Sequence, residues 1–132
     1  MKVLALDYGL ARTGVAVSDP TGTVARPLGV VERAAGDDGL ARLAALARDE
    51  DVDRIVVGLP LTLRGEIGSQ AAETERFVDR LRAAVAVPVE TFDERFTTRL
   101  AAASPGARAP EDARAAAHLL ETYLEWLSAR AT

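Results

Sequence analysis

Residues 1–20 read MKVLALDYGLARTGVAVSDP, and this segment predicts the first two strands of a β-sheet. The first apolar run ends at Asp7, which indicates a short strand with a carboxylate at its carboxyl end. After a turn over 8–11, a second apolar run covers 13–18 and stops at an Asp-Pro pair. Because the connection is so short, we expect the two strands to be antiparallel neighbours.

The rest of the chain predicts three more strands and four helices. Residues 24–32 continue the antiparallel set, whereas the uninterrupted apolar run at 54–58 is typical of a parallel strand buried on both faces. The other expected elements are a helix that opens at 37–39, a helix capped by Ser69, a strand at 87–92, a short helix from Thr97 or Thr98 to Ala103, and a last helix from Pro110 to about Arg130. We therefore expect an α/β fold in which a mixed five-stranded sheet is flanked by helices.

The composition limits the chemistry that is available. The chain has 132 residues, which suits one domain over 1–132. It lacks cysteine, which excludes disulfides, thiolate zinc sites and a cysteine nucleophile, and its single histidine excludes a multi-histidine metal site. Asp7 interrupts the first apolar run too early for a signal peptide, and no run approaches the roughly 20 apolar residues of a membrane span. We expect a cytoplasmic protein without a membrane partner.

The net charge of −4 at first argues against a protein that coats nucleic acid through bulk electrostatics. Residues 37–54, however, hold six acids and three bases, so this segment contributes −3 and the remainder of the chain is near −1. Several of the remaining acids are candidate metal ligands, whose charge a cation would offset. The charge pattern thus predicts that nucleic acid binding depends on a metal.

Four carboxylates stand out by their positions: Asp7, Asp93, Glu94 and Asp112. Asp7 ends the first strand and the adjacent pair ends the fifth, and ligands of open sheets usually bind at that edge. Asp112 falls in the first turn of the last helix, on the line of its apolar stripe. Carboxylates that converge without histidine or cysteine favour a hard cation, so the predicted cofactor is Mg²⁺ or Mn²⁺.

Each of these carboxylates also has a structural interpretation, which the sequence leaves open. Asp112 suits the dipole at the start of a helix, and Asp7 suits a turn. Because side chains alternate along a strand, one member of the 93–94 pair is expected to face away from the site.

Four segments resemble the successive motifs of the YqgF/RuvX family, whose members are named as pre-16S rRNA nucleases and as Holliday junction resolvase-like proteins. These segments are DYGLARTGVAVSD at 7–19, VGLP at 57–60, DERFTT at 93–98 and DARAA at 112–116. Together they cover nearly the whole chain in the right order. The resemblance implies an RNase H-like fold and metal-dependent hydrolysis of nucleic acid phosphodiester bonds, in maturation of the 5′ end of pre-16S rRNA or at branched DNA.

The resemblance also maps the active-site carboxylates to Asp7, to Asp93 and Glu94, and to Asp112. Related resolvases carry an acidic residue just after the fourth strand, where residues 58–61 of this chain read GLPL. We expect the pair after the fifth strand to compensate. Glu94 is favoured as the metal ligand alongside Asp7 and Asp112, because its longer side chain reaches further from the sheet edge.

Four arginines are candidate substrate-binding residues. Arg12 follows the first turn, Arg95 follows the carboxylate pair with Arg99 four residues beyond it, and Arg64 lies in a glycine-containing loop. The alternative for Arg12 and Arg95 is that each pairs with a neighbouring carboxylate and relieves repulsion in the site. The segment 104–110 is shorter than the basic loop that family members often carry, which weakens the expected grip on a substrate.

Two classes of function remain open at this point. In the first, the chain is a divalent-metal-dependent nuclease for structured RNA or branched DNA, and a homodimer suits a nuclease of this size. In the second, the same fold is a non-catalytic module that binds nucleic acid or a protein. A third interpretation, an actin-like phosphate-binding fold, requires two such domains, and 132 residues supply one.

Overall fold

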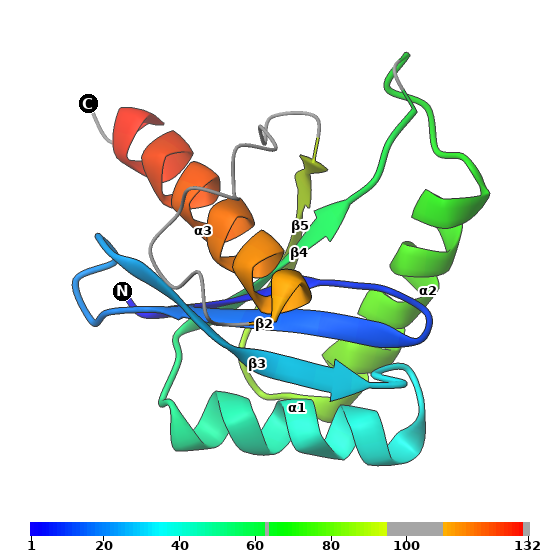
Figure 1. Ribbon diagram of the computed structural model, residues 1–132, viewed down its shortest axis with the longest axis horizontal. Helices are drawn as coiled ribbons and strands as arrows, with labels where there is room; N and C mark the ends of the chain where they lie inside the picture. The colour runs from blue at the N-terminus through cyan, green and yellow to red at the C-terminus, as the bar shows by residue number, and fades with distance from the viewer. Residues whose placement is uncertain (63, 95–109, 131–132) are drawn as a thin grey trace.

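The computed structural model describes residues 1–62, 64–94 and 110–130, which are built around a five-stranded sheet (Figure 1). β1, β2 and β3 are antiparallel neighbours, whereas β4 and β5 run parallel to β1. The sheet has the order β3-β2-β1-β4-β5, and its strands are β1 (Val3–Asp7), β2 (Arg12–Ser18), β3 (Ala25–Glu32), β4 (Arg54–Leu59) and β5 (Val89–Asp93). The expected mixed five-stranded sheet is confirmed.

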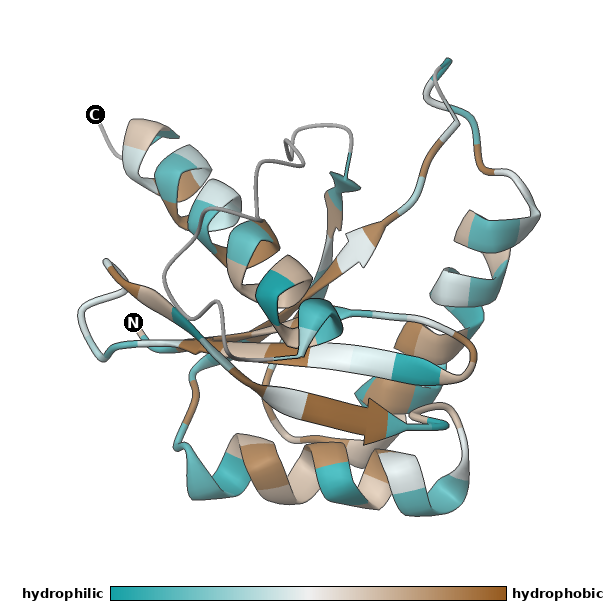
Figure 2. Ribbon diagram, viewed as in Figure 1, coloured by the Kyte–Doolittle hydropathy of each residue, from teal (hydrophilic) through white to brown (hydrophobic). Residues whose placement is uncertain are grey.

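Three helices cover the two faces of this sheet. α1 (Asp37–Asp49) and α2 (Ser69–Ala84) pack on one face, and α3 (Glu111–Arg130) packs on the other (Figure 1). Figure 2 shows alternating hydrophobic and hydrophilic bands along the helices, as expected of amphipathic helices. Within the described ranges, no helix combines the length and the apolar character that crossing a membrane requires.

Alternation along β1 assigns its side chains to the two faces. Leu4 and Leu6 belong to the core shared with α1 and α2, whereas Val3 and Ala5 belong to the core under α3. By the same alternation, Asp7 lies on the α3 face at the carboxyl end of the strand. The first candidate carboxylate is therefore at the edge where the parallel strands end.

The interior strand β4 is buried on both faces, as its uninterrupted apolar run predicts. Ile55, Val56 and Val57 are each 0% exposed, because β4 lies between β1 and β5 and between the two helical layers. The carboxyl ends of β1, β4 and β5 meet at one edge, since these three strands are parallel.

Several expected boundaries differ from the structure by one or two residues. The fifth strand begins at Val89 rather than at residue 87, because Pro88 has no N–H to donate to a neighbouring strand. Ser69 is the first residue of α2 rather than its cap; the cap position is taken by Gly68, which has no side chain to bond the helix. The short helix expected to end at Ala103 lies outside the described residues.

The turn between β2 and β3 is organised by the carboxylate of Asp19. Its Oδ1 accepts hydrogen bonds from the backbone N–H groups of Thr23 at 2.8 Å and Val24 at 2.9 Å, and the Thr21 hydroxyl donates to Oδ2. The Thr21 hydroxyl, followed by the two backbone groups, holds the pKa of Asp19 well below its usual value. The turn is therefore stabilised by the ionised form of this side chain.

We expect Asp19→Asn to destabilise the fold at neutral pH and to lose this effect in acid. A carboxylate whose pKa is lower in the folded than in the unfolded chain contributes stability above the unfolded pKa, about 3.9, and this contribution disappears as the pH falls towards the folded pKa. Urea titrations should show the free energies of unfolding of the two proteins converging below about pH 4. Glu75→Gln, at an exposed position inside α2, controls for the loss of one negative charge. Stability curves that stay parallel at all pH values would contradict the prediction.

Candidate active site

The candidate active site lies at the carboxyl end of β1, on the face of the sheet that α3 covers. In the antiparallel register Asp7 is directly opposite Gly14 of β2. On the other side of β1, Leu6 pairs with Val57 of the parallel strand β4. The next residue of each strand is Asp7 and Gly58, so Gly58 lies beside Asp7. Paired residues of neighbouring strands point to the same face, so Asp7 projects between two positions that carry no side chain.

α3 approaches Asp7 from the Gly14 side. A Cβ at position 14 would overlap the backbone carbonyl of Asp112 and would lie 3.0 Å from the backbone nitrogen of Ala113. The first turn of α3 therefore rests directly on β2, and only a glycine permits this approach. Asp112, whose side chain is partly buried, is brought to one side of Asp7.

Glu94 approaches from the Gly58 side. A Cβ at position 58 would lie 2.6 Å from Oε1 and 2.8 Å from Cγ of Glu94, so this side chain lies across Gly58. Asp93 is the last residue of β5 and follows Phe92, which belongs to the core under α3. Alternation directs Asp93 to the opposite face. Of the adjacent pair, Glu94 is the residue that shares a face with Asp7.

Arg12 forms an ion pair with Asp112, in which Nη2 lies 3.0 Å from Oδ2. The Arg12 side chain is 64% exposed and that of Asp112 is 34% exposed. The pairing of Arg12 with a neighbouring carboxylate, one of the two interpretations of its sequence position, is thus present. Ion pairs this exposed contribute only about 0–1 kcal/mol, so a competing partner can displace either member.

The turn between β1 and β2 fixes the backbone that carries Arg12. The hydroxyl of the buried Thr13 hydrogen-bonds to the backbone nitrogen and oxygen of Gly9, both at 3.4 Å, and a Cβ on Gly9 would overlap the Arg12 carbonyl. Tyr8 stacks on Phe77 of α2, with ring centroids 4.3 Å apart. Burial, followed by the nearby charge of Glu73, raises the pKa of Tyr8.

The other predicted substrate-binding arginines are placed only in part. Arg64 is an exposed residue of the loop between β4 and α2. Arg95 and Arg99 lie outside the described residues.

The carboxylates do not form a closed metal site in the described arrangement. Across residues 1–62, 64–94 and 110–130, no three His, Cys, Asp or Glu side chains are grouped closely enough to hold a metal ion. The Asp112 carboxylate is directed to Arg12 instead. The donor chemistry nevertheless fits a hard cation, because Asp7, Glu94 and Asp112 offer only oxygen and reach one face of the sheet at the two glycines.

Sequence patterns did not point to Gly14 and Gly58 as parts of the site. The signal that was available is a glycine inside an apolar strand, which weakens the strand unless another element approaches closely. Gly29 shows why this signal is ambiguous, because it also lies inside a strand and a Cβ there would meet nothing within 4 Å.

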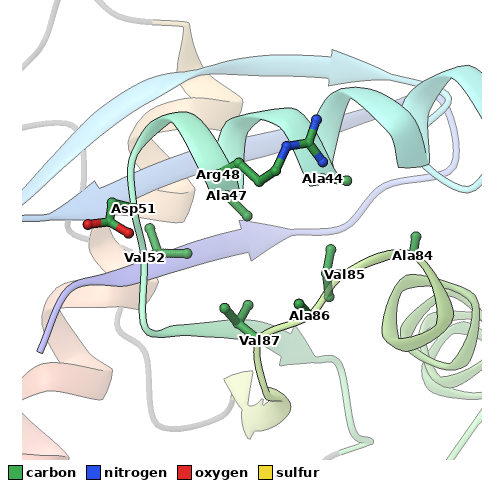
Figure 3. Close-up of a pocket in the computed structure, with 9 residues that line it drawn as sticks. All are labelled: Ala44, Ala47, Arg48, Asp51, Val52, Ala84, Val85, Ala86 and Val87. Carbon is green, nitrogen blue, oxygen red and sulfur yellow. The ribbon is translucent and has the colours of Figure 1, made fainter.

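A pocket elsewhere on the protein is separate from this site. It lies between the C-terminal half of α1 and residues 84–87, which lead into β5 (Figure 3). Alanine and valine make up most of its lining, with Arg48 and Asp51 as the charged members. These segments enter β4 and β5 at their amino ends, whereas the candidate site is at the carboxyl ends.

Three glycine-to-alanine variants should lose different amounts of free energy of unfolding, because the added methyl group meets different neighbours at each position. Gly14→Ala should lower the free energy of unfolding by about 1–3 kcal/mol, because the added methyl collides with the backbone of α3. Gly58→Ala should cost less, since it meets the flexible side chain of Glu94, and Gly29→Ala should change stability by less than about 0.5 kcal/mol. Urea unfolding measures all three, and equal losses for Gly14→Ala and Gly29→Ala would contradict the close approach of α3.

Known folds resemble this one over almost its whole length. RuvC of T. thermophilus, solved in complex with a Holliday junction substrate, matches with a TM-score of 0.70 at 16% identity, over 98% of this chain and 96% of RuvC. Fowlpox virus resolvase, solved with Holliday junction DNA, matches with a TM-score of 0.58 at 11% identity, over 96% of this chain and 99% of the resolvase. The expected RNase H-like fold is confirmed.

Sequence comparison assigns the family. The "Putative pre-16S rRNA nuclease" of Chloroflexus aurantiacus is 46% identical over 96 residues, which are 73% of this chain and 63%, less than two thirds, of that relative. A protein of the same name in Anaeromyxobacter dehalogenans is 42% identical over 133 residues, which cover 95% of this chain and 97% of the relative. The family model described as "RuvX: Holliday junction resolvase" matches residues 1–126. The chain belongs to the RuvX family, as its four motifs indicated.

Proposed function

We propose that the protein is a divalent-metal-dependent nuclease that hydrolyses nucleic acid phosphodiester bonds. Its proposed substrate is the 5′ end of pre-16S rRNA, with Holliday junction DNA as a second substrate. The observation that carries this proposal is the position of Asp7 between Gly14 and Gly58, which bring Asp112 and Glu94 to its two sides. The family description and the names of the relatives support the substrate class.

Asp7, Glu94 and Asp112 are the proposed ligands of Mg²⁺ or Mn²⁺. Such a cation, when bound, polarises the phosphodiester and activates a water molecule. Glu94 lies across Gly58 and so supplies at the end of β4 the carboxylate that β4 itself lacks. Asp93 is directed to the other face and is proposed to have a structural role.

The proposed contacts with the nucleic acid backbone come from Arg12, Arg64, Arg95 and Arg99. Guanidinium groups suit this role, because their planar donors match the oxygens of a phosphate. The chain has a net charge of −4, so we propose that a bound cation is needed before phosphates can approach the carboxylates. An enzyme that processes ribosomal RNA acts where ribosomes are assembled, and the proposal includes a cytoplasmic location. A homodimer stays a prediction.

Asp7→Asn should abolish cleavage while leaving the fold intact. Asparagine has the same shape and keeps the register with Gly14, but it removes the charge that a cation requires. We expect the cleavage rate of a pre-16S rRNA 5′ fragment and of a four-way DNA junction in Mg²⁺ to fall by at least about a hundredfold. Urea unfolding serves as the control for folding. Unchanged cleavage would rule out Asp7 as a ligand, and tight binding by the unsubstituted protein without cleavage in Mg²⁺ or Mn²⁺ would favour a non-catalytic binding module.

Glu94→Gln and Asp93→Asn form a matched pair that tests which acid at the end of β5 acts. Glu94→Gln should reduce cleavage by at least about a hundredfold, because its side chain shares a face with Asp7. Asp93→Asn should retain most of the activity, because its side chain leaves the strand on the other face. The same cleavage assay measures both variants, and the reverse ranking would assign the catalytic role to Asp93.

A further inference from the structure

We propose that Arg12 is a positioning residue that changes partners: it holds Asp112 until a divalent cation takes this carboxylate, and it is then released to a phosphate of the nucleic acid. The inference rests on the proposed metal site and names a coupling within it. Metal binding and nucleic acid binding would then strengthen each other through one side chain.

The ion pair joins two elements whose backbones are held by separate contacts. Gly14 lets the backbone of Asp112 rest on β2, and the tight turn at Gly9 fixes the backbone of Arg12 at the start of the same strand. Neither backbone has to move when the partners change, because only the two side chains meet. We therefore expect the exchange to proceed by rotation of side chains.

Arg12 reaches Asp112 although another carboxylate is nearer in the sheet. In the β2–β3 register Glu32 is directly opposite Arg12, yet the ion pair in the structure is with Asp112 of α3. Cross-strand pairs of opposite charge are the ordinary partners in a sheet. Because Arg12 pairs with Asp112, its guanidinium is directed towards α3 and away from β3 at the edge of the sheet.

Exposure makes this pair easy to exchange. The Arg12 side chain is 64% exposed, so solvent screens its attraction to Asp112 and leaves the guanidinium accessible to a phosphate. A divalent cation carries twice the charge of Arg12 and is shared with Asp7 and Glu94, so it is the stronger partner for Asp112. Coupling between two ligands is reciprocal, which means that nucleic acid bound to Arg12 must also favour the cation.

Manganese binding tests the first half of the exchange without any activity measurement. Mn²⁺ affinity, measured by electron paramagnetic resonance in the absence of nucleic acid, should be about two- to fivefold tighter in Arg12→Gln than in the unsubstituted protein, because the competitor for Asp112 is gone. Arg26→Gln is the matched control, since it removes an exposed arginine that pairs with Glu50 at 3.4 Å on the far side of the sheet. Its Mn²⁺ affinity should not change.

This titration distinguishes failure of the partner exchange at Arg12 from failure of the proposed metal site. If the unsubstituted protein binds Mn²⁺ and Arg12→Gln binds it equally or more weakly, the exchange is wrong and the metal site stands. If neither protein binds Mn²⁺, the metal site is wrong and the exchange fails with it.

Nucleic acid binding tests the second half of the exchange. Fluorescence anisotropy of a labelled four-way DNA junction, in EDTA and in Ca²⁺, gives the factor by which a cation strengthens binding. This factor should be several times larger in the unsubstituted protein than in Arg12→Gln, and Arg12→Lys should be intermediate because it keeps the charge without the planar donors. An equal factor in the three proteins, or no strengthening in any of them, would overturn the proposal.

Discussion

The absence of a side chain at Gly14 lets the first turn of α3 rest on β2, and the rest of the site depends on this approach. Any side chain there would push the helix away from the sheet and take Asp112 with it. The same approach lets Ala116, Leu120 and Tyr123 pack on the strands beneath α3. Gly14 therefore affects both the stability of the core under α3 and the position of Asp112, a candidate metal ligand.

The other half of α3 is held by polar and aromatic contacts around Tyr123. Its hydroxyl accepts a hydrogen bond from Nη1 of Arg54 at 2.7 Å and donates to Glu90, which is itself paired with Arg54 at 3.0 Å. The ring packs edge-on against Phe92 with centroids 5.4 Å apart. Because α3 is held at Gly14 and again at Tyr123, it is fixed in both position and direction, and Asp112 has little freedom beyond its own side-chain torsions.

The fold and the candidate site differ in how much of each could be predicted. Strand and helix positions follow from hydrophobic periodicity, which is local, so the five-stranded sheet and the burial of β4 on both faces were predicted correctly. The roles of Gly14 and Gly58 depend on the segments that pack against them, which are distant in the sequence. No local sequence pattern shows which segments these are. The ion pair of Arg12 with Asp112 spans most of the chain, so the sequence suggested a carboxylate partner for Arg12 without identifying which one.

The proposed exchange accounts for the binding of a polyanion by a protein with a net charge of −4. Carboxylates near Asp7 repel phosphate, and in the structure Arg12 neutralises one of them, Asp112. A cation that replaced Arg12 at Asp112 would add two positive charges to the site and free a third for the phosphate. On this proposal the negative charge of the site makes nucleic acid binding conditional on the metal, because without the cation Arg12 is held by Asp112.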